Sequence, residues 1–160
     1  MPGVIESYIH TGNQIGVLVE INCQNEVTAT TPEFKTLAKE IALQIAASPN
    51  VRYTKASDVP PSIIEQIDRQ LKPEARKREI IQKRIREICL YDRPYIRDDS
   101  ITIEDLIELR IARLGEKIAV KRFVRFIIDE STNNPPGDFG SGVPSNPLPN
   151  APTFFGEEAN

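Results

Sequence analysis

Residues 3–23 read GVIESYIHTGNQIGVLVEINC, in which two runs rich in β-branched residues flank the turn-forming residues TGNQ at 11–14. Strand-forming runs on either side of a Gly-Asn turn are typical of a β-hairpin. In the second run, alternate apolar residues would share one face of a strand: Ile15, Val17, Val19, Ile21 and Cys23. The pattern predicts a hairpin with one buried face, and Leu18 is the apolar exception on the other face.

Helical periodicity begins shortly after the hairpin. Thr31 and Pro32 are typical of an N-cap and a first helical residue, because proline lacks the N–H that this position leaves unpaired. The apolar residues that follow recur at helical spacing: Phe34, Leu37, Ala38, Ile41, Ala42 and Ile45. We therefore predict a helix at about 32–47, ended by the sequence SPN at 48–50.

Further elements are predicted between this helix and residue 128. A short strand is expected at 51–53, a second helix begins at the Pro pair at 60–61, and a third helix extends from Pro73 to about Tyr91.

A fourth helix begins after Thr102, with Asp105 as its capping-box partner, and ends at Gly115. The run KIAVKRFVRFII at 117–128 is rich in Val, Phe and Ile and is predicted to be a strand that pairs with the hairpin. The fold class is therefore α+β, with a small antiparallel β-sheet packed against several α-helices.

The composition indicates one domain and a tail. The chain has 160 residues, 20 basic and 23 acidic, with a net charge of −3, which excludes a protein dedicated to packaging DNA. We expect a core domain at 1–130 and a disordered tail at 131–160, because the tail is rich in Pro, Gly, Ser and Asn. Phe139, Phe154 and Phe155 are either anchors of a docking motif or part of a solvated extension.

No catalytic residue, metal site or cofactor is predicted. Cys23 and Cys89 fall on apolar faces, as buried thiols do, and His10 is the one histidine. The sequence contains neither a glycine-rich phosphate-binding motif nor a signal, transit or membrane-spanning segment. We expect a protein of a reducing cytoplasm or stroma, bound neither to a membrane nor to DNA.

The helix expected after Pro73 carries an excess of positive charge. Seven basic and three acidic residues lie between 72 and 88, and Arg76, Lys77, Lys83 and Arg84 are candidates for contact with RNA or an acidic partner. A solvated helix face is the alternative interpretation, because no aromatic residue lies among these charges.

Four blocks of the sequence resemble the core of elongation factor Ts, especially of the cyanobacterial and plastid type. They are ESYIHTGNQIGVLVEINC at 6–23, FKTLAKEIALQIAASPN at 34–50, CLYDRPYIRDDSITIEDLI at 89–107 and LGEKIAVKRFVRFII at 114–128. The resemblance implies a non-enzymatic nucleotide exchange factor that binds the GTPase elongation factor Tu and promotes release of GDP. It also implies an antiparallel sheet with packed helices, in agreement with the pattern of the residues.

The resemblance implies that the partner is contacted through His10, Asn25, Glu26 and Val27. The family usually has a Thr-Asp-Phe-Val-Ala segment whose Asp-Phe pair wedges into the GTPase, whereas this chain reads NEVTA at 25–29. Replacing the aromatic residue by Val27 should weaken that contact by about 1–3 kcal/mol, or about one to two decades in exchange. A polar loop that leads into the Thr31 cap is the alternative interpretation of this segment.

Two other departures from the family leave the function open. The resemblance starts at the first core strand, so we expect the N-terminal domain of ubiquitin-associated type to be absent, and the stretch around 72–83 looks shortened. The chain is interpreted as an exchange factor with full or weakened activity; the alternative is an exchange-inactive binding or scaffold module on the ribosome or another complex. A homodimer formed through an exposed sheet face also stays open.

Overall fold

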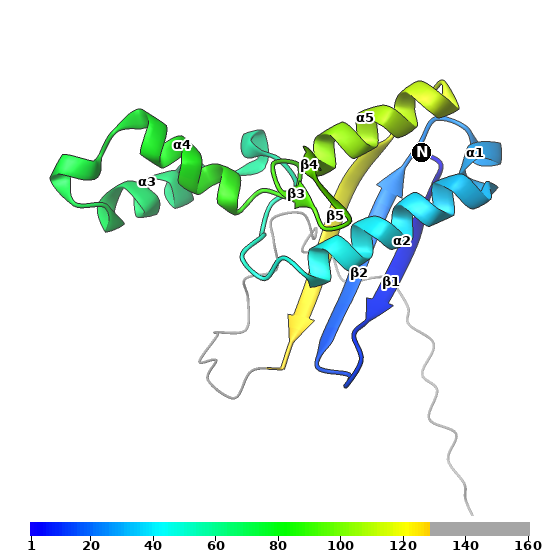
Figure 1. The fold of residues 1–160 in the computed structure, drawn as a ribbon, viewed down its shortest axis with the longest axis horizontal. Helices are drawn as coiled ribbons and strands as arrows, with labels where there is room; N and C mark the ends of the chain where they lie inside the picture. The colour runs from blue at the N-terminus through cyan, green and yellow to red at the C-terminus, as the bar shows by residue number, and fades with distance from the viewer. Residues whose placement is uncertain (129–160) are drawn as a thin grey trace, which may run out of the picture.

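A three-stranded antiparallel sheet lies at the centre of the structure, a computed structural model that describes residues 1–128 (Figure 1). Its strands are β1 (Gly3–Ile9), β2 (Ile15–Asn22) and β5 (Ala119–Ile127), in the order β1-β2-β5. Gly12 and Asn13 have φ angles of 93° and 57°, the left-handed conformation that a tight hairpin turn requires. The predicted hairpin and its pairing with the last strand are confirmed.

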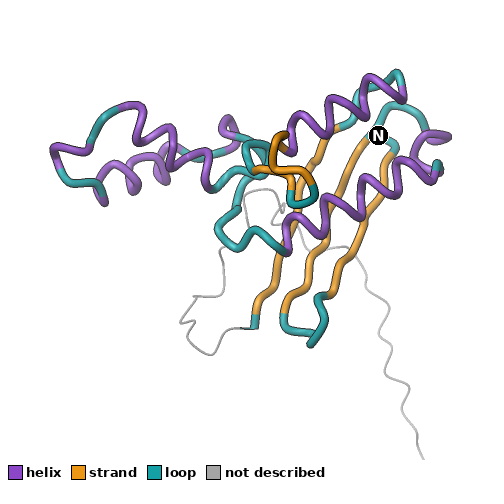
Figure 2. Tube along the Cα trace, in the orientation of Figure 1, coloured by secondary structure: helices purple, strands orange, loops and turns teal. Residues whose placement is uncertain are grey.

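Two helices cover one face of this sheet (Figure 2). The first, α2 (Pro32–Ala46), is capped by the Thr31 hydroxyl, which accepts a hydrogen bond from the Phe34 N–H at 3.2 Å. The second, α5 (Ile103–Leu114), has the predicted capping box of Thr102 and Asp105 and ends at Gly115 with φ 73°. Both helices, with their predicted starts and ends, are confirmed to within two residues.

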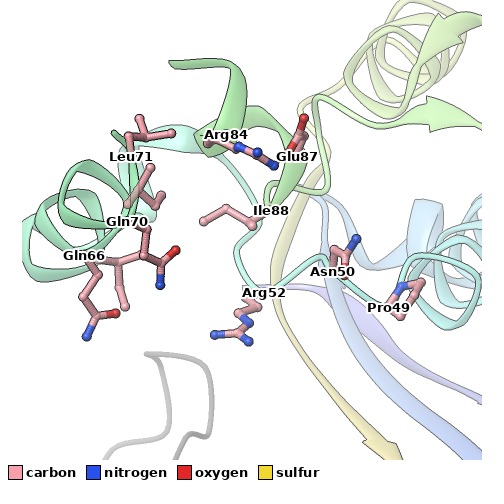
Figure 3. A pocket seen from close by; sticks show the side chains of 11 residues that line it. Pro49, Asn50, Arg52, Gln66, Gln70, Leu71, Arg84, Glu87 and Ile88 are labelled. Carbon is pink, nitrogen blue, oxygen red and sulfur yellow. Dashed lines mark hydrogen bonds and ion pairs between the residues drawn. The ribbon is translucent and has the colours of Figure 1, made fainter. Parts of the chain in front are cut away.

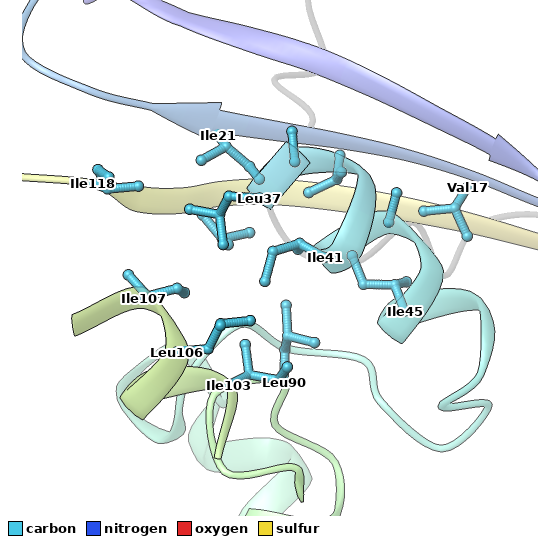
Figure 4. Close-up of a cluster of buried hydrophobic side chains, with 14 of the residues drawn as sticks. Val17, Ile21, Leu37, Ile41, Ile45, Leu90, Ile103, Leu106, Ile107 and Ile118 are labelled. Atoms are coloured by element: carbon cyan, nitrogen blue, oxygen red, sulfur yellow. The ribbon is translucent and has the colours of Figure 1, made fainter. Parts of the chain in front are cut away.

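The core lies between the sheet and these two helices (Figure 4). It is formed by fully buried apolar side chains, among them Val19, Ile21, Phe34, Leu37, Ile41, Ile45, Leu90 and Ile103. The predicted alternation of β2 is confirmed, since Val17, Val19 and Ile21 are buried while Leu18 is 48% exposed on the opposite face.

Arg125 joins β5 to the carboxyl end of α2. Its guanidinium donates hydrogen bonds to the main-chain oxygens of Ile45, Ser48, Pro49 and Val51, at 3.1, 3.0, 2.6 and 3.0 Å. Carbonyls in the last turn of a helix have no partner within the helix, so one arginine supplies donors both to the helix end and to the loop that follows.

A helical hairpin projects from the body of the protein, on the left of Figure 1. We call residues 60–88 the arm; it contains α3 (Pro61–Gln70), a 3₁₀ turn at Pro73–Ala75 and α4 (Arg78–Glu87). The helix predicted from Pro73 to Tyr91 is therefore wrong at both ends. At its start, Arg76 has ψ 51°, outside the helical range, and at its end the chain must turn back into the body.

A short parallel contact closes the base of the arm. The Ile88 oxygen accepts hydrogen bonds from the N–H groups of Arg52 and Tyr53 at 2.9 and 3.1 Å, and the Leu90 N–H donates to the Tyr53 oxygen at 2.8 Å. The strand predicted at 51–53 is wrong, because one isolated bridge between Tyr53 and Cys89 stands in its place. We call this bridge and its hydrogen bonds the neck.

Two small elements were not predicted: a hairpin of β3 (Pro94–Tyr95) and β4 (Asp98–Thr102), and the one-turn helix α1 (Glu26–Thr30). The buried Gln44 of α2 holds the hairpin by donating to the Pro94 oxygen at 3.2 Å and accepting from the Ile96 N–H at 2.9 Å. A side chain from a distant helix thus supplies hydrogen bonds that these short strands do not form with each other.

Candidate functional site

Helix α1 is a rigid projection at the end of β2. The side chain of Asn25 caps it by accepting a hydrogen bond from the Val27 N–H at 2.9 Å. The Thr30 and Thr31 hydroxyls donate to the main-chain oxygens of Val27 and Thr28, at 2.7 and 2.8 Å, and close the turn from its other end. Residues 26–30 therefore form a capped helical turn where the alternative interpretation expected a loop.

Contacts with the loop after α5 fix the base of α1. The Gln24 N–H donates to Oε2 of Glu116 at 3.1 Å, and Oε1 of Gln24 accepts from the Lys117 N–H at 3.2 Å. Beneath them the Cys23 thiol donates to the Asn25 oxygen at 3.3 Å, and burial, together with the charge of Glu116, raises the pKa of this thiol. The turn is therefore held on both sides.

The two residues at the tip of α1 point into solvent. Glu26 is exposed and the side chain of Val27 is 70% exposed, although valine is apolar. A scattered exposed valine is common, but this one stands on a braced turn beside a carboxylate. The pair can therefore offer a partner one apolar contact and one negative charge without a large loss of backbone entropy.

His10 lies far from this tip. It is exposed at the hairpin turn, and its Nδ1 is 3.0 Å from the Tyr8 hydroxyl. The eight residues of β2 separate the hairpin turn from α1, which at about 3.3 Å per residue is about 25 Å. The structure brings Asn25, Glu26 and Val27 together and leaves His10 at the opposite end of the sheet.

The predicted basic residues lie on the arm, apart from both positions. Arg76, Lys77, Lys83 and Arg84 are all exposed; Arg76 donates to the Leu71 oxygen at 3.3 Å, and Arg84 pairs with Glu87 at 3.2 Å. Lys83 forms no ion pair within residues 1–128 and is available for an anionic ligand.

A groove between the arm and the body was missed by sequence reasoning (Figure 3). It has a volume of about 580 Å³ and is lined by the loop at 49–52, by α3 and by the end of α4. Its walls come from three separate segments, so no local sequence signal marks it.

The face of the sheet that α2 and α5 leave uncovered is apolar in part. Ile5, Ile9, Leu18 and Phe126 are 70%, 61%, 48% and 62% exposed on neighbouring strands. The sequence does contain a signal for this surface, because Ile5 and Ile9 alternate with the half-buried residues of β1.

The thiol of Cys89 is fully buried. Burial is the largest of the causes that raise the pKa of Cys89 to about 12, so its thiol stays protonated at neutral pH. Among residues 1–128, no three His, Cys, Asp or Glu side chains are grouped to hold a metal ion. In the same part of the chain, no helix has the length and apolar character needed to span a membrane. Phe139, Phe154 and Phe155 lie outside the described residues.

Comparison with known proteins identifies the family of this chain. A family model described as elongation factor TS matches residues 1–130. The chain is 46% identical to elongation factor Ts of Rippkaea orientalis and 47% identical to the chloroplastic elongation factor Ts of Guillardia theta, with 88% of the chain aligned to each. It spans 61% of the length of the first relative and 70% of the second. The chain belongs to the elongation factor Ts family.

Proposed function

We propose that this protein binds elongation factor Tu and promotes the release of GDP, with the tip of α1 as its principal contact. The observation that carries the proposal is the braced turn that exposes Glu26 and Val27 at the position of the family's Asp-Phe pair. Family membership supports the identity of the partner. As expected from the relatives, we place the protein in a bacterial cytoplasm or a plastid stroma.

Such a factor works by coupling two binding equilibria. If it binds the nucleotide-free GTPase more tightly than the GDP-bound one, its presence must weaken GDP binding by the same factor. No group of this protein needs to react, and an apolar side chain beside a carboxylate is sufficient to displace elements around a phosphate or a Mg²⁺ ion. Glu26 would act by repelling these anionic phosphates or by attracting the cation.

We expect a weaker exchange activity than an aromatic residue at position 27 would give. Phenylalanine exposes roughly 50–60 Å² more apolar side-chain area than valine, which at about 25 cal/mol per Å² amounts to about 1.4 kcal/mol. This difference corresponds to about a tenfold change in rate if the contact is made mainly in the transition state for nucleotide release. V27F should therefore exchange nucleotide about ten times faster than the natural chain.

Release of a fluorescent GDP analogue from elongation factor Tu, followed by stopped flow, tests this proposal. The natural chain should accelerate release, and the double variant E26A/V27A should lose the acceleration. L109A is the matched control, because Leu109 is 58% exposed on α5 and outside α1, and its rate should be unchanged. No acceleration at saturating concentration of the natural chain would refute an exchange function.

Binding of elongation factor Tu without faster GDP release would support the alternative function. If the natural chain binds elongation factor Tu with a measurable Kd but leaves the GDP release rate unchanged, the protein is an exchange-inactive binding module. Isothermal titration calorimetry on the same preparations measures this Kd. The ribosome then becomes the next partner to test, through the exposed cations of the arm, with the quadruple substitution of Arg76, Lys77, Lys83 and Arg84 by Gln as the variant.

His10 can contact the same partner as α1 only if the interface extends along the whole length of β2. Because about 25 Å separates it from α1, the losses of binding free energy in H10A and E26A should add in the double variant within about 0.5 kcal/mol. A loss in H10A would place both ends of β2 in the interface. An unchanged Kd in H10A would remove His10 from it.

A homodimer is the remaining partner proposal, and the uncovered sheet face supports it. Ile5, Ile9, Leu18 and Phe126 present apolar side chains to solvent there, and patches of this kind are often protein interfaces. Light scattering coupled to size-exclusion chromatography should give a dimer mass that F126S converts to that of a monomer. A monomer mass for the natural chain at 100 µM would rule out this dimer.

A further inference from the structure

The groove between the arm and the body has no role in the exchange proposal. Its floor is made of half-buried apolar side chains from both helices of the arm: Ile63, Ile67, Leu71 and Ile88. In Figure 3, Ile88 points from the end of α4 towards α3, and Arg52 stands on the body side. An apolar floor with polar walls is typical of a site for a short peptide.

The body side of the groove carries uncompensated positive charge. Arg52 is exposed and forms no ion pair among residues 1–128. Nearby, Arg125 bonds to main-chain carbonyls, and both burial and the charge of Arg52 lower its pKa. Two guanidinium groups within electrostatic range of one another favour a negatively charged occupant.

The end of the described chain lies at the hairpin turn, where the Ile128 N–H donates to the Gln14 oxygen at 2.8 Å, three residues beyond Arg125. Arg125 of β5 donates to the oxygen of Pro49, a residue that lines the groove, and β5 ends two residues later at Ile127. Residue 128 is therefore about 10 Å of chain from a residue in contact with the groove wall.

The sequence after residue 128 carries the negative charge and the aromatic side chains that would complement the groove. Residues 129–160 contain five acidic residues and no basic one, and they include the segment FFGEE at 154–158. Two aromatic side chains followed by two carboxylates match an apolar floor that ends at a free arginine. The net charge of −5 in this segment contrasts with +2 for residues 1–128.

We propose that the segment 154–158 of the same chain binds in this groove, with Phe154 and Phe155 on the apolar floor and the two glutamates towards Arg52. A linker of about 26 residues has a root-mean-square reach of about 28 Å, which is ample for the distance. Tethering gives an effective concentration on the order of 1 mM. A motif that binds with a Kd of about 0.1 mM as a free peptide would then occupy the groove about 90% of the time.

Paramagnetic relaxation in the full-length chain tests the contact. A nitroxide attached through A159C should broaden the side-chain amide signals of Gln66 and Gln70, which line the groove, and spare those of Gln24 and Asn25, which lie at the other end of β2 from the hairpin turn. The two native thiols are buried, so the label reacts at the introduced position. Broadening equal at both places, or at neither, would overturn the proposal.

Variants assign the contact to the proposed residues. F154S/F155S should weaken binding at least tenfold and lower the occupancy from about 90% to below about 50%. F139S is the matched control and should leave the broadening unchanged. R52E should reduce the broadening in the same way as the double variant, whereas K121E, an exposed charge reversal on β5, should not. Loss of the broadening in F139S alone would identify a different segment and refute the assignment.

A mixed sample distinguishes the same chain from a second copy. Isotope-labelled protein without nitroxide is combined with unlabelled protein that carries the nitroxide, so any broadening must pass between molecules. The proposal predicts no broadening of Gln66 and Gln70 in this sample at 50 µM. Broadening of Gln66 and Gln70 in the mixed sample would show that the groove takes the segment of another copy, and the intramolecular contact would be wrong.

Discussion

Replacing Arg125 by methionine should destabilise the protein more than any other single charge removal on β5. The side chain is half-buried on the face that α2 covers, and its guanidinium serves four main-chain oxygens between residues 45 and 51. Methionine keeps most of the length and apolar area, so the comparison isolates the hydrogen bonds.

The size of the effect follows from those contacts. A hydrogen bond to a charged group contributes about 1.5–3 kcal/mol, but such contributions do not add and exposed carbonyls can bind water instead. The Pro49 bond is exposed, whereas the other three are partly buried. We therefore expect R125M to lose about 3 kcal/mol of unfolding free energy, equivalent to about 10 °C in Tm for a domain of this size.

Urea unfolding followed by circular dichroism at 222 nm measures this loss, since the chain has no tryptophan. With an m-value of about 2 kcal/mol/M, the midpoint should fall by about 1.5 M. R122M is the matched control: Arg122 is on the same strand, half-exposed, and pairs with Glu20 at 2.7 Å. A surface ion pair of this kind is worth about 0–1 kcal/mol. If R125M and R122M lose equal stability, the reasoning about Arg125 is refuted.

Three other predictions concern stability. Q44L should cost about 2–3 kcal/mol in urea unfolding, because it leaves the Pro94 oxygen and the Ile96 N–H without their partner, and hydrogen exchange at Ile96 should accelerate. G115A should cost about 1 kcal/mol, purely from the left-handed φ of 73°, since a Cβ there would meet no atom within 4 Å; G115N should recover part of the loss. The pKa of Cys89 is raised from 9.0 to about 12, so the unfolded chain ionises first and stability should fall as pH rises from 9 to 12. C89A should show a shallower fall over that range, and identical slopes would contradict this assignment.

Local signals explain which parts of the fold could be predicted. The Thr31 cap, the Thr102 capping box and the Gly115 stop act within a few residues of the helix ends, so they can be identified from the local sequence. The alternation of β2 is equally local. By contrast, α1 is too short to show helical periodicity. In the other unpredicted element, β3 begins with proline and β4 with aspartate, two residues that strands disfavour, and the hairpin is held by Gln44, some 50 residues away.

In the candidate site, too, some residues could be predicted from the sequence, whereas their arrangement depends on tertiary contacts. Glu26 and Val27 could be chosen from the resemblance to a family, but the caps and the Glu116 contact that brace them depend on tertiary structure. The separation of His10 from α1 is a property of the sheet and has no counterpart in residue order. The groove combines residues from three segments, and its free Arg52 is ordinary in sequence.

The neck makes the arm an interchangeable insert. Tyr53 and Cys89 are bridge partners, and backbones paired in this way lie about 4.8 Å apart, so the chain enters and leaves the arm at almost the same place. Residues of the arm beyond the buried cluster of Tyr53, Val59 and Cys89 can be added or removed without moving the sheet or α2. A graft of a different hairpin in place of the outer part of the arm would therefore give a carrier whose central core keeps its geometry while its outer appendage is exchanged.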